Sequence, residues 1–279
     1  MTMLVFTACL LAASAGNPAH DLDVLRSSKV REKVAEAAVR VARSGDAAAL
    51  RKLGDLLASR AFLARLDDIR EGQPGYSNLR QVFLALEATP SIMTQALCLK
   101  VMSAPAFVED PGRQFFALPA LAAVRPVSPE AAVMFERMNL HGLWGSSAPL
   151  LASNGSERAL AIVESILADR SKPEDERVSV AHEAIVPNRT QPGIIAMVGR
   201  LVDGPLEINV VLALADSVFG YRPDKWFGKR RNPPQVPNWK TASPEAQRAA
   251  TTLGRRLLTR KDLPEELRTT IESTLRFSE

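Results

Sequence analysis

Apolar residues recur along this chain at spacings of three and four, the period of an amphipathic helix. Between Leu22 and Arg43, one apolar stripe lies opposite a charged face. Its members are Val30, Val34, Ala37, Ala38 and Val41. Ser44-Gly45 ends this predicted helix, and Asp46 is placed to cap the next one. No segment alternates convincingly at period two, so the pattern predicts an all-α fold.

Prolines mark the positions where most of these helices are expected to begin. A proline in the first turn costs no hydrogen bond, because the first N–H groups of a helix lack an intrahelical acceptor. The expected starts are Pro90, Asp110-Pro111, Ser128-Pro129, Ser156-Glu157, Lys172-Pro173, Gln191-Pro192, Gly204-Pro205, Ser243-Pro244 and Leu263-Pro264. Gly72-Gln73-Pro74-Gly75 is a clear break. Roughly a dozen helices of about three to four turns result.

Two stretches of the chain resemble each other. Leu160, Val163, Leu167 and Asp169 match Ile194, Met197, Leu201 and Asp203 at an offset of 34 residues. Pro173, Val178, Ala181 and Val186 then match Pro205, Val210, Ala213 and Val218 at an offset of 32. We attribute the difference to a shorter turn between the helices. Self-similarity at this period is typical of stacked helix pairs, which share one continuous core.

The helix pattern at Lys29–Ala38 and again at Glu176–Ile185 resembles the second helix of the HEAT-repeat superfamily. In both stretches a valine is followed by charged or polar positions and then by small residues. The resemblance covers most of Leu22 to Phe277 and fits poorly between Met138 and Ser156. It implies a right-handed α-solenoid of about six antiparallel helix pairs. The superfamily's usual role as a binding scaffold is implied by analogy alone.

The N-terminus carries the features of an export signal. Residues 1–15 contain no charged side chain, and an apolar run ends in Ala13-Ser14-Ala15, a signal-peptidase type of site. We expect a signal peptide at 1–15, a linker at 16–21 and a helical domain at 22–279, in a periplasmic or extracellular protein. The alternative is an N-terminal helix of a cytoplasmic protein, since no basic residue precedes the run. No other segment is apolar enough to span a membrane.

Residues with catalytic or metal-binding chemistry are sparse. The three histidines, His20, His141 and His182, are scattered, and no phosphate loop or nucleophile elbow occurs. We expect no metal and no cofactor, and an enzyme is not indicated. Cys98 is interpreted as a small buried hydrophobic residue. Asn154-Gly155-Ser156 and Asn188-Arg189-Thr190 match the glycosylation acceptor pattern, to which we assign no role.

Composition is ordinary for a globular protein, with 46% hydrophobic and 24% charged residues, but the basic charge is local. The stretch 221–241 holds six basic residues and one acidic residue, a charge of +5 in a chain whose net charge is +4. The rest of the chain has a net charge of −1 and therefore lacks the extended positive surface that binds DNA phosphates. Nucleic acid is accordingly disfavoured as a partner.

The loop 221–242 also holds two of the three tryptophans. One interpretation is a strap whose rings cover the last helix pairs. The other is an electropositive aromatic ledge for an acidic peptide, a polyanion or a phosphate. The candidate binding residues of the ledge are Arg222, Lys225, Trp226, Lys229, Arg230, Arg231, Trp239 and Lys240.

Three classes of function remain open from the residues. The first is a non-enzymatic exported scaffold that binds another protein or an acidic ligand. The second is a HEAT-like nucleic-acid-binding or DNA-repair protein that uses the Trp/Arg segment. The third is an enzyme, or an enzyme accessory, with its site on the concave face. The sequence sets neither the partner nor the oligomeric state.

Overall fold

A computed structural model describes residues 17–67, 69–70, 73–74, 76–140, 144–220 and 237–276. The described chain is all-helical apart from one very short antiparallel strand pair. Contacts divide the chain into two compact units, the first ending at Val124 and the second beginning at Arg125. The helical domain expected over 22–279 therefore contains parts of both units.

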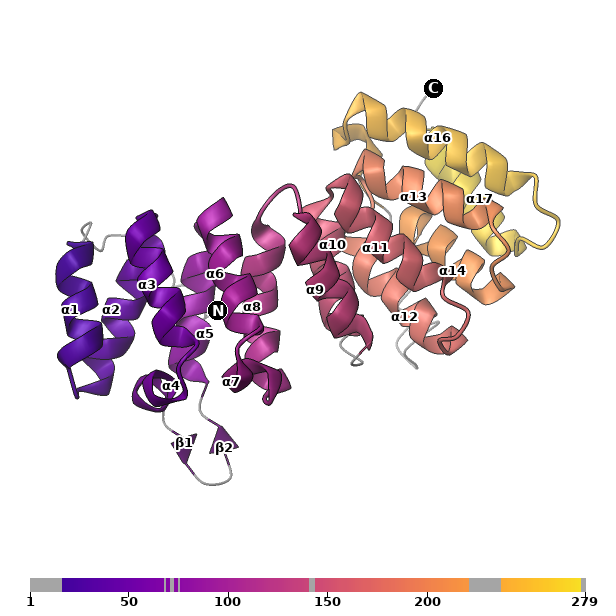
Figure 1. Cartoon of the computed structure of the whole chain (residues 1–279). Coiled ribbons are helices and arrows are strands. Elements are labelled where there is room, and N and C mark those ends of the chain that lie inside the picture. The colour runs from indigo at the N-terminus through magenta and orange to yellow at the C-terminus, as the bar shows by residue number, and fades with distance from the viewer. Residues whose placement is uncertain are drawn as a thin grey trace. The chain divides into compact units, whose positions relative to one another are not determined.

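The helices of the first unit form two rows (Figure 1). One row contains α1 (Pro18–Ser27), α3 (Ala47–Leu57) and α6 (Ile92–Met102). The other contains α2 (Arg31–Arg43), α5 (Ser77–Glu87) and α8 (Pro111–Ala123). Two short helices, α4 (Arg60–Leu66) and α7 (Pro105–Val108), lie beside them. Strands β1 (Ile69–Arg70) and β2 (Gln73–Pro74) pair Ile69 with Pro74 and Arg70 with Gln73.

Within its described residues, the second unit repeats the two-row arrangement with four helices in each row. The first row is α9 (Pro129–Leu140), α11 (Glu157–Ala168), α13 (Pro192–Asp203) and α16 (Pro244–Leu258). The second is α10 (Trp144–Asn154), α12 (Glu174–Ile185), α14 (Ile208–Phe219) and α17 (Glu265–Leu275). Two 3-10 turns, η1 (Val186–Asn188) and η2 (Trp239–Thr241), follow α12 and precede α16.

Buried apolar side chains hold the helices of each unit together. In the first unit the rings of Phe83 and Phe107 meet edge to face, with centroids 6.1 Å apart. In the second, the apolar stripes of α11 and α13 are buried through Val163 and Met197. Each fully buried large apolar side chain contributes about 1.5–3 kcal/mol relative to an exposed one. The stripes seen in the sequence are therefore the surfaces that hold the rows together.

Side-chain caps explain why several helices begin where the sequence predicts. Asp46 accepts a hydrogen bond from the Ala49 N–H, and Ser243 accepts one from the Ala246 N–H. Asp110 caps α8 in the same way, with Pro111 in the first turn. The starts at Pro129, Glu157, Glu174, Pro192 and Glu265 also agree with the sequence patterns. These elements are confirmed.

The N-terminal boundaries differ from the prediction. Residues 18–21, expected in a linker, form the first turn of α1, because Asn17 accepts a hydrogen bond from the Ala19 N–H and Pro18 follows it. The helix expected from Leu22 to Arg43 is interrupted after Ser27. There the Ser28 hydroxyl accepts a hydrogen bond from the Val30 N–H, which competes with helical bonding.

Two other boundaries also differ. Pro90 precedes α6 instead of opening it, because Ser91 is the cap and accepts a hydrogen bond from the Thr94 N–H. The helix expected at Gly204-Pro205 begins at Ile208. The segment between Met138 and Ser156, which fits the repeat poorly, contains the helix α10. Within the described part of the chain, no helix is both long and apolar enough to cross a bilayer.

The internal repeat corresponds to α11–α12 and α13–α14. The first helices start 35 residues apart, at Glu157 and Pro192, and the second start 34 apart, at Glu174 and Ile208. Helix starts do not fix the register of a repeat, so the predicted offsets of 34 and 32 stay predictions. Nearly all residues of α14 from Val210 to Phe219 are themselves buried.

Candidate functional site

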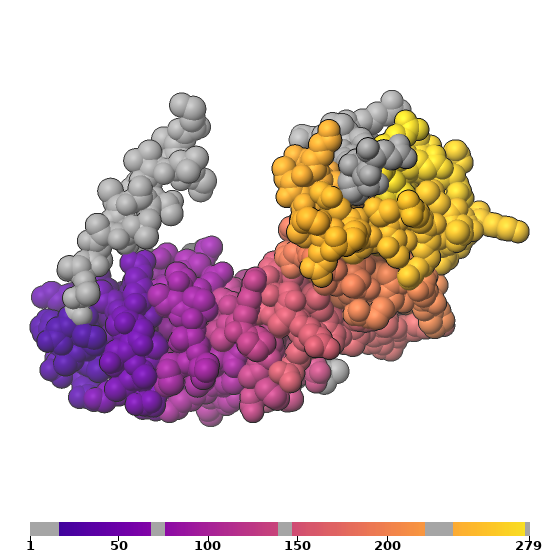
Figure 2. Space-filling view, turned by 90° about the horizontal axis from the view of Figure 1, so that it is seen from above, coloured from indigo at the N-terminus to yellow at the C-terminus, as the bar shows by residue number. Residues whose placement is uncertain are grey.

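An open pocket of about 360 Å³ lies between α13 and α16 in the second unit. Both helices belong to the same row, and α16 lies at the surface of its unit, where the gold-coloured residues are seen (Figure 2). The pocket is lined by Ile195, Ala196, Gly199, Arg200, Ala249, Thr252, Leu253 and Arg256. The spacing of these residues places one face of each helix on the pocket.

Small side chains leave this space open. Gly199 differs from Gly54, Gly193 and Gly254 in the space that a Cβ atom would have. A Cβ atom added at Gly54, Gly193 or Gly254 would lie 3.3 Å or less from a leucine side chain of a neighbouring helix. A Cβ at Gly199 would meet Arg256 Nη1 at 3.8 Å, an ordinary contact. Close packing therefore explains the other three glycines and does not require a glycine at position 199.

Two guanidinium groups border the pocket, and a carboxylate holds each of them. Arg200 donates hydrogen bonds of 2.6–3.2 Å from Nε and Nη2 to both oxygens of Glu164 on α11. This bonding raises the pKa of Arg200. Arg256 Nη1 donates to the Gly199 carbonyl at 3.2 Å and to Asp203 at 2.5 Å. Both arginines lie in the last turns of their helices, where the helix dipole favours a positive charge.

Basic charge extends beyond the pocket. Residues 239–262 contain six basic and two acidic residues, a net charge of +4. Residues 222–262 together contain eleven basic and three acidic ones, a net charge of +8, which leaves −4 for the rest of the chain. Arg248 and Arg255 are exposed on α16 and form no ion pair within the described residues. The charge asymmetry is therefore larger than the count over 221–241 indicates.

Most of the predicted ledge lies outside the described residues. This applies to Arg222, Lys225, Trp226, Lys229, Arg230 and Arg231. Of the two that are described, Lys240 is exposed and Trp239 is only 3% exposed. The Trp239 ring lies 6.3 Å from that of Phe219, and Gln247 of α16 donates a hydrogen bond to the Trp239 carbonyl. At this position the side chain contacts the protein interior, as in the strap interpretation.

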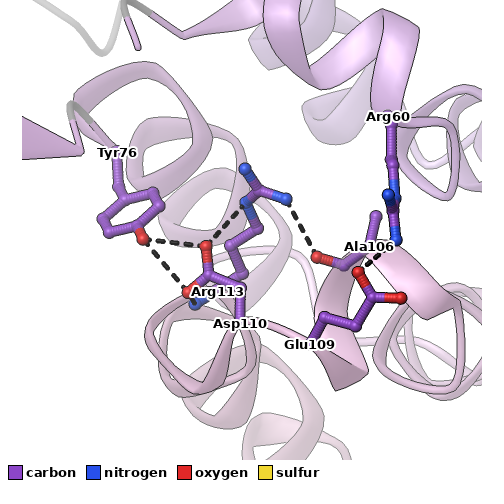
Figure 3. A network of polar contacts seen from close by, with 6 residues as sticks. All are labelled: Arg60, Tyr76, Ala106, Glu109, Asp110 and Arg113. Carbon is purple, nitrogen blue, oxygen red and sulfur yellow. Dashed lines mark hydrogen bonds and ion pairs between the residues drawn. The ribbon is translucent and has the colours of Figure 1, made fainter. Parts of the chain in front are cut away.

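A polar network in the first unit joins α5, α7 and α8 (Figure 3). The Tyr76 hydroxyl donates to the Asp110 carboxylate at 2.9–3.0 Å. Arg113 pairs with the same carboxylate at 3.2 Å and donates to the Ala106 carbonyl at 2.9 Å. Burial and the bond to Asp110 raise the pKa of Tyr76. Since Asp110 also caps α8, the network fixes the start of this helix against Tyr76, just before α5.

Two residues that could have carried chemistry are buried. The His182 ring is 3% exposed, and its Nδ1 lies 2.8 Å from the Ser217 hydroxyl. Because that hydroxyl donates to the Ala213 carbonyl, it accepts the proton of His182 Nδ1. Cys98 is fully buried, and burial raises the pKa of its thiol to about 12. The sequence interpretation of Cys98 as a packing residue is confirmed.

Both asparagines of the glycosylation pattern are buried, Asn154 at 3% and Asn188 at 6% exposure. Asn188 donates to the Ala184 carbonyl and accepts from Gln191, while Asn154 accepts from the Ser156 hydroxyl. In the folded chain these side chains therefore serve as internal hydrogen-bond partners. Among the described residues, no three His, Cys, Asp or Glu side chains are grouped so that they could hold a metal ion.

Sequence reasoning did not identify Arg200 and Arg256. Each lies one turn after a small residue, Ala196 or Thr252, but this signal gains meaning only once α13 and α16 are known to be neighbours. Comparison of the chain with protein-family models, with curated proteins and with solved structures finds no match. The HEAT resemblance therefore stays a prediction.

Proposed function

We propose that this protein is a non-enzymatic, exported scaffold of the HEAT-like type that binds an acidic partner protein at the basic face of α16. In this proposal the helix pairs are HEAT-like repeats of a right-handed α-solenoid. Rows of three and four helices correspond to seven helix pairs, compared with the six expected. Stacked pairs of this kind present long ordered surfaces, and binding is their usual use.

The observation that carries the proposal is the basic charge of α16 together with the residues that flank it. The net charge of +4 over residues 239–262 favours a negatively charged partner and would accelerate its association. The pocket beside this helix adds a concave, partly apolar feature of the kind that anchors a partner side chain. A charged rim around an apolar centre is the usual anatomy of a protein interface.

The ion pairs around the pocket favour a protein over a nucleic acid. Arg200 and Arg256 are paired with Glu164 and Asp203, and Arg260 is paired with Asp262. Nucleic-acid affinity depends on cations that are free to replace counterions along the phosphate backbone. Carboxylates at three of these positions would repel phosphates, whereas a surface of mixed charge suits a protein partner.

The test is capture of partners from the native host with residues 16–279 as bait. We compare the wild type with Arg248→Glu/Arg255→Glu, which reverses the exposed charge of α16 without breaking an ion pair seen in the described residues. The matched control is Arg51→Glu/Arg80→Glu, the same charge change at exposed positions of the first unit. An acidic protein that the wild type and the control retain and the α16 variant loses is the expected result.

Two outcomes would overturn the proposal. One is a partner retained equally by both charge variants, and the other is enrichment of no acidic protein. Export is tested separately by sequencing the N-terminus of the native protein. The expected first residue is Gly16, and a native chain that retains residues 1–15 would contradict export.

A further inference from the structure

The pocket between α13 and α16 combines an apolar floor with a polar end. Ile195 and Leu253 are buried side chains that form part of its lining, and Ala196 and Ala249 add further small apolar surface. Arg200 and Arg256 belong to the last turns of the two helices, so the charges gather at one end. A volume of about 360 Å³ lies at the low end of the roughly 300–1,000 Å³ range of ligand pockets.

Arg256 keeps its carboxylate-binding edge available. Its bonds to Gly199 and Asp203 both use Nη1, which leaves Nε and Nη2 without a partner among the described residues. These two N–H groups point in parallel and form the edge that grips a carboxylate with two hydrogen bonds. In Arg200 the corresponding edge is already occupied by Glu164. Arg256 is therefore the primary anchor for an incoming carboxylate.

Arg256 is also held in place before any ligand arrives. Its contacts with Asp203 and with the Gly199 carbonyl restrict the rotamers of a long side chain, so less conformational entropy is lost when it binds. The nearby Asp203 carboxylate disfavours a ligand with two negative charges, such as phosphate. A single carboxylate next to an apolar group fits both the charge and the floor.

We propose that this pocket takes one aliphatic side chain of an acidic partner segment, while an adjacent Glu or Asp of that segment binds Arg256. The inference rests on the proposed function and assigns its anchor. The absence of a side chain at Gly199 fits this role, since packing does not require a glycine there and a larger residue would narrow the polar end of the pocket. The small side chains of Ala196 and Ala249 leave room for the aliphatic group that enters.

The probe is the acetylated, amidated peptide Glu-Glu-Leu-Glu-Glu flanked by Gly-Ser, with photo-leucine in place of leucine. It is cross-linked to residues 16–279, and the adduct is located by mass spectrometry. We expect adducts within residues 195–200 and 249–256. A peptide with glycine in place of leucine should bind about tenfold or more weakly, because it loses the burial of one aliphatic side chain.

Two variants test the two halves of the pocket. Ala249→Leu fills the floor without changing the charge, and Arg256→Gln removes the carboxylate anchor. Each should reduce peptide binding about tenfold, the loss expected when one buried contact or charged hydrogen-bond pair is removed. The controls are Ala161→Leu, at an exposed position of α11, and Arg80→Gln in the first unit; both should bind within about twofold of wild type. Circular dichroism verifies that every variant is folded.

The outcomes separate this inference from the scaffold proposal. Adducts elsewhere, or full binding by Ala249→Leu, overturn the pocket assignment. If Arg248→Glu/Arg255→Glu still abolishes partner capture in that case, the proposal that α16 binds an acidic partner remains supported and only the pocket assignment is lost. Absence of any peptide binding at millimolar concentration also overturns the inference, and the capture experiment then decides the scaffold proposal independently.

Discussion

At the scale of single residues, the Trp239 indole links the end of α14 to the start of α16. It is buried, and its ring lies 6.3 Å from that of Phe219. We expect Trp239→Ala to lower the free energy of unfolding by about 3–5 kcal/mol, the usual cost of deleting a buried large aromatic side chain. Urea unfolding measures this, with the exposed neighbour Lys240→Ala as control. A loss below about 1 kcal/mol would contradict a strap role for this ring.

Alanine substitutions at Gly199 and Gly254 should change the free energy of unfolding in opposite directions. Gly199→Ala should raise the free energy of unfolding by about 0.5–1 kcal/mol, because alanine restricts the unfolded chain and its Cβ finds an ordinary contact at 3.8 Å. Gly254→Ala should be destabilising, because its Cβ would lie 3.0–3.1 Å from Leu275 and Ile271. Thermal unfolding of both variants checks the signs. A destabilised Gly199→Ala variant would show that packing does require this glycine.

Individual residues also show what the sequence could not reveal about the site. The tryptophans and basic residues of 221–242 stand out by type, whereas Arg200 and Arg256 resemble any surface arginine until α13 and α16 are brought together. Periodicity predicts which face of a helix is buried and does not predict which helix covers it. A pocket made by the absence of side chains, as at Gly199, leaves an even weaker signal.

At the scale of elements, an ion pair connects α12 to the start of α14. Arg177 is only 2% exposed, and its Nη2 lies 2.8 Å from Glu207, the residue before α14. A hydrogen bond from its own backbone N–H and one from Arg177 hold the pKa of Glu207 below its ordinary value. A lowered folded-state pKa means that the pair stabilises the protein above the unfolded pKa of about 4.5 and that this stabilisation is lost as the pH falls.

Glu207→Gln tests this connection. The variant should be less stable than wild type at neutral pH, because it leaves the Arg177 charge buried without its counterion. The difference between the two urea midpoints should shrink as the pH is lowered below 4.5, since wild-type Glu207 then becomes neutral as well. Glu272→Gln, at an exposed position of α17, is the control. A difference independent of pH would show that the charge of Glu207 does not contribute.

Helix existence could be predicted better than helix boundaries. Caps and first-turn prolines gave correct starts at Pro111, Pro192 and Pro244, because these signals act within one turn. The short helices α4 and α7 were missed, since four to seven residues carry too little periodicity and are held by their neighbours. The burial pattern of α14 gives little information on its register, because a helix buried almost all round has no polar face to mark its orientation.

At the scale of the whole molecule, the division into two units could not be predicted. The break between the helices at 124–128 resembles the other helix breaks of the chain, and only the pattern of contacts separates the units there. The charge asymmetry, in contrast, can be read from the sequence, since residues 222–262 carry +8 and the remainder −4. Such a distribution would attract the acidic partner of the proposed function toward residues 222–262.

A destabilising substitution in one compact unit should leave the local stability of the other unit unchanged. We expect Trp239→Ala to speed backbone hydrogen exchange in helices of the second unit, such as α14 and α16, because local stability depends on nearby buried contacts. Exchange in α2 and α5 of the first unit should stay at the wild-type rate. Mass spectrometry of peptic fragments measures both. Equal acceleration in both units would show that they unfold as one.

The Cys98 thiol is fully buried and its pKa is raised to about 12, so its rate of chemical labelling should measure how often the first unit opens. The thiolate is the nucleophile that attacks an alkylating reagent and displaces its leaving group, so the closed protein should not react. Each modification should therefore record one opening of α6 out of its row. A chain without residues 1–15 also lacks Cys9, so Cys98 is its single cysteine. The rate of labelling would then measure the local opening around α6 without an engineered probe.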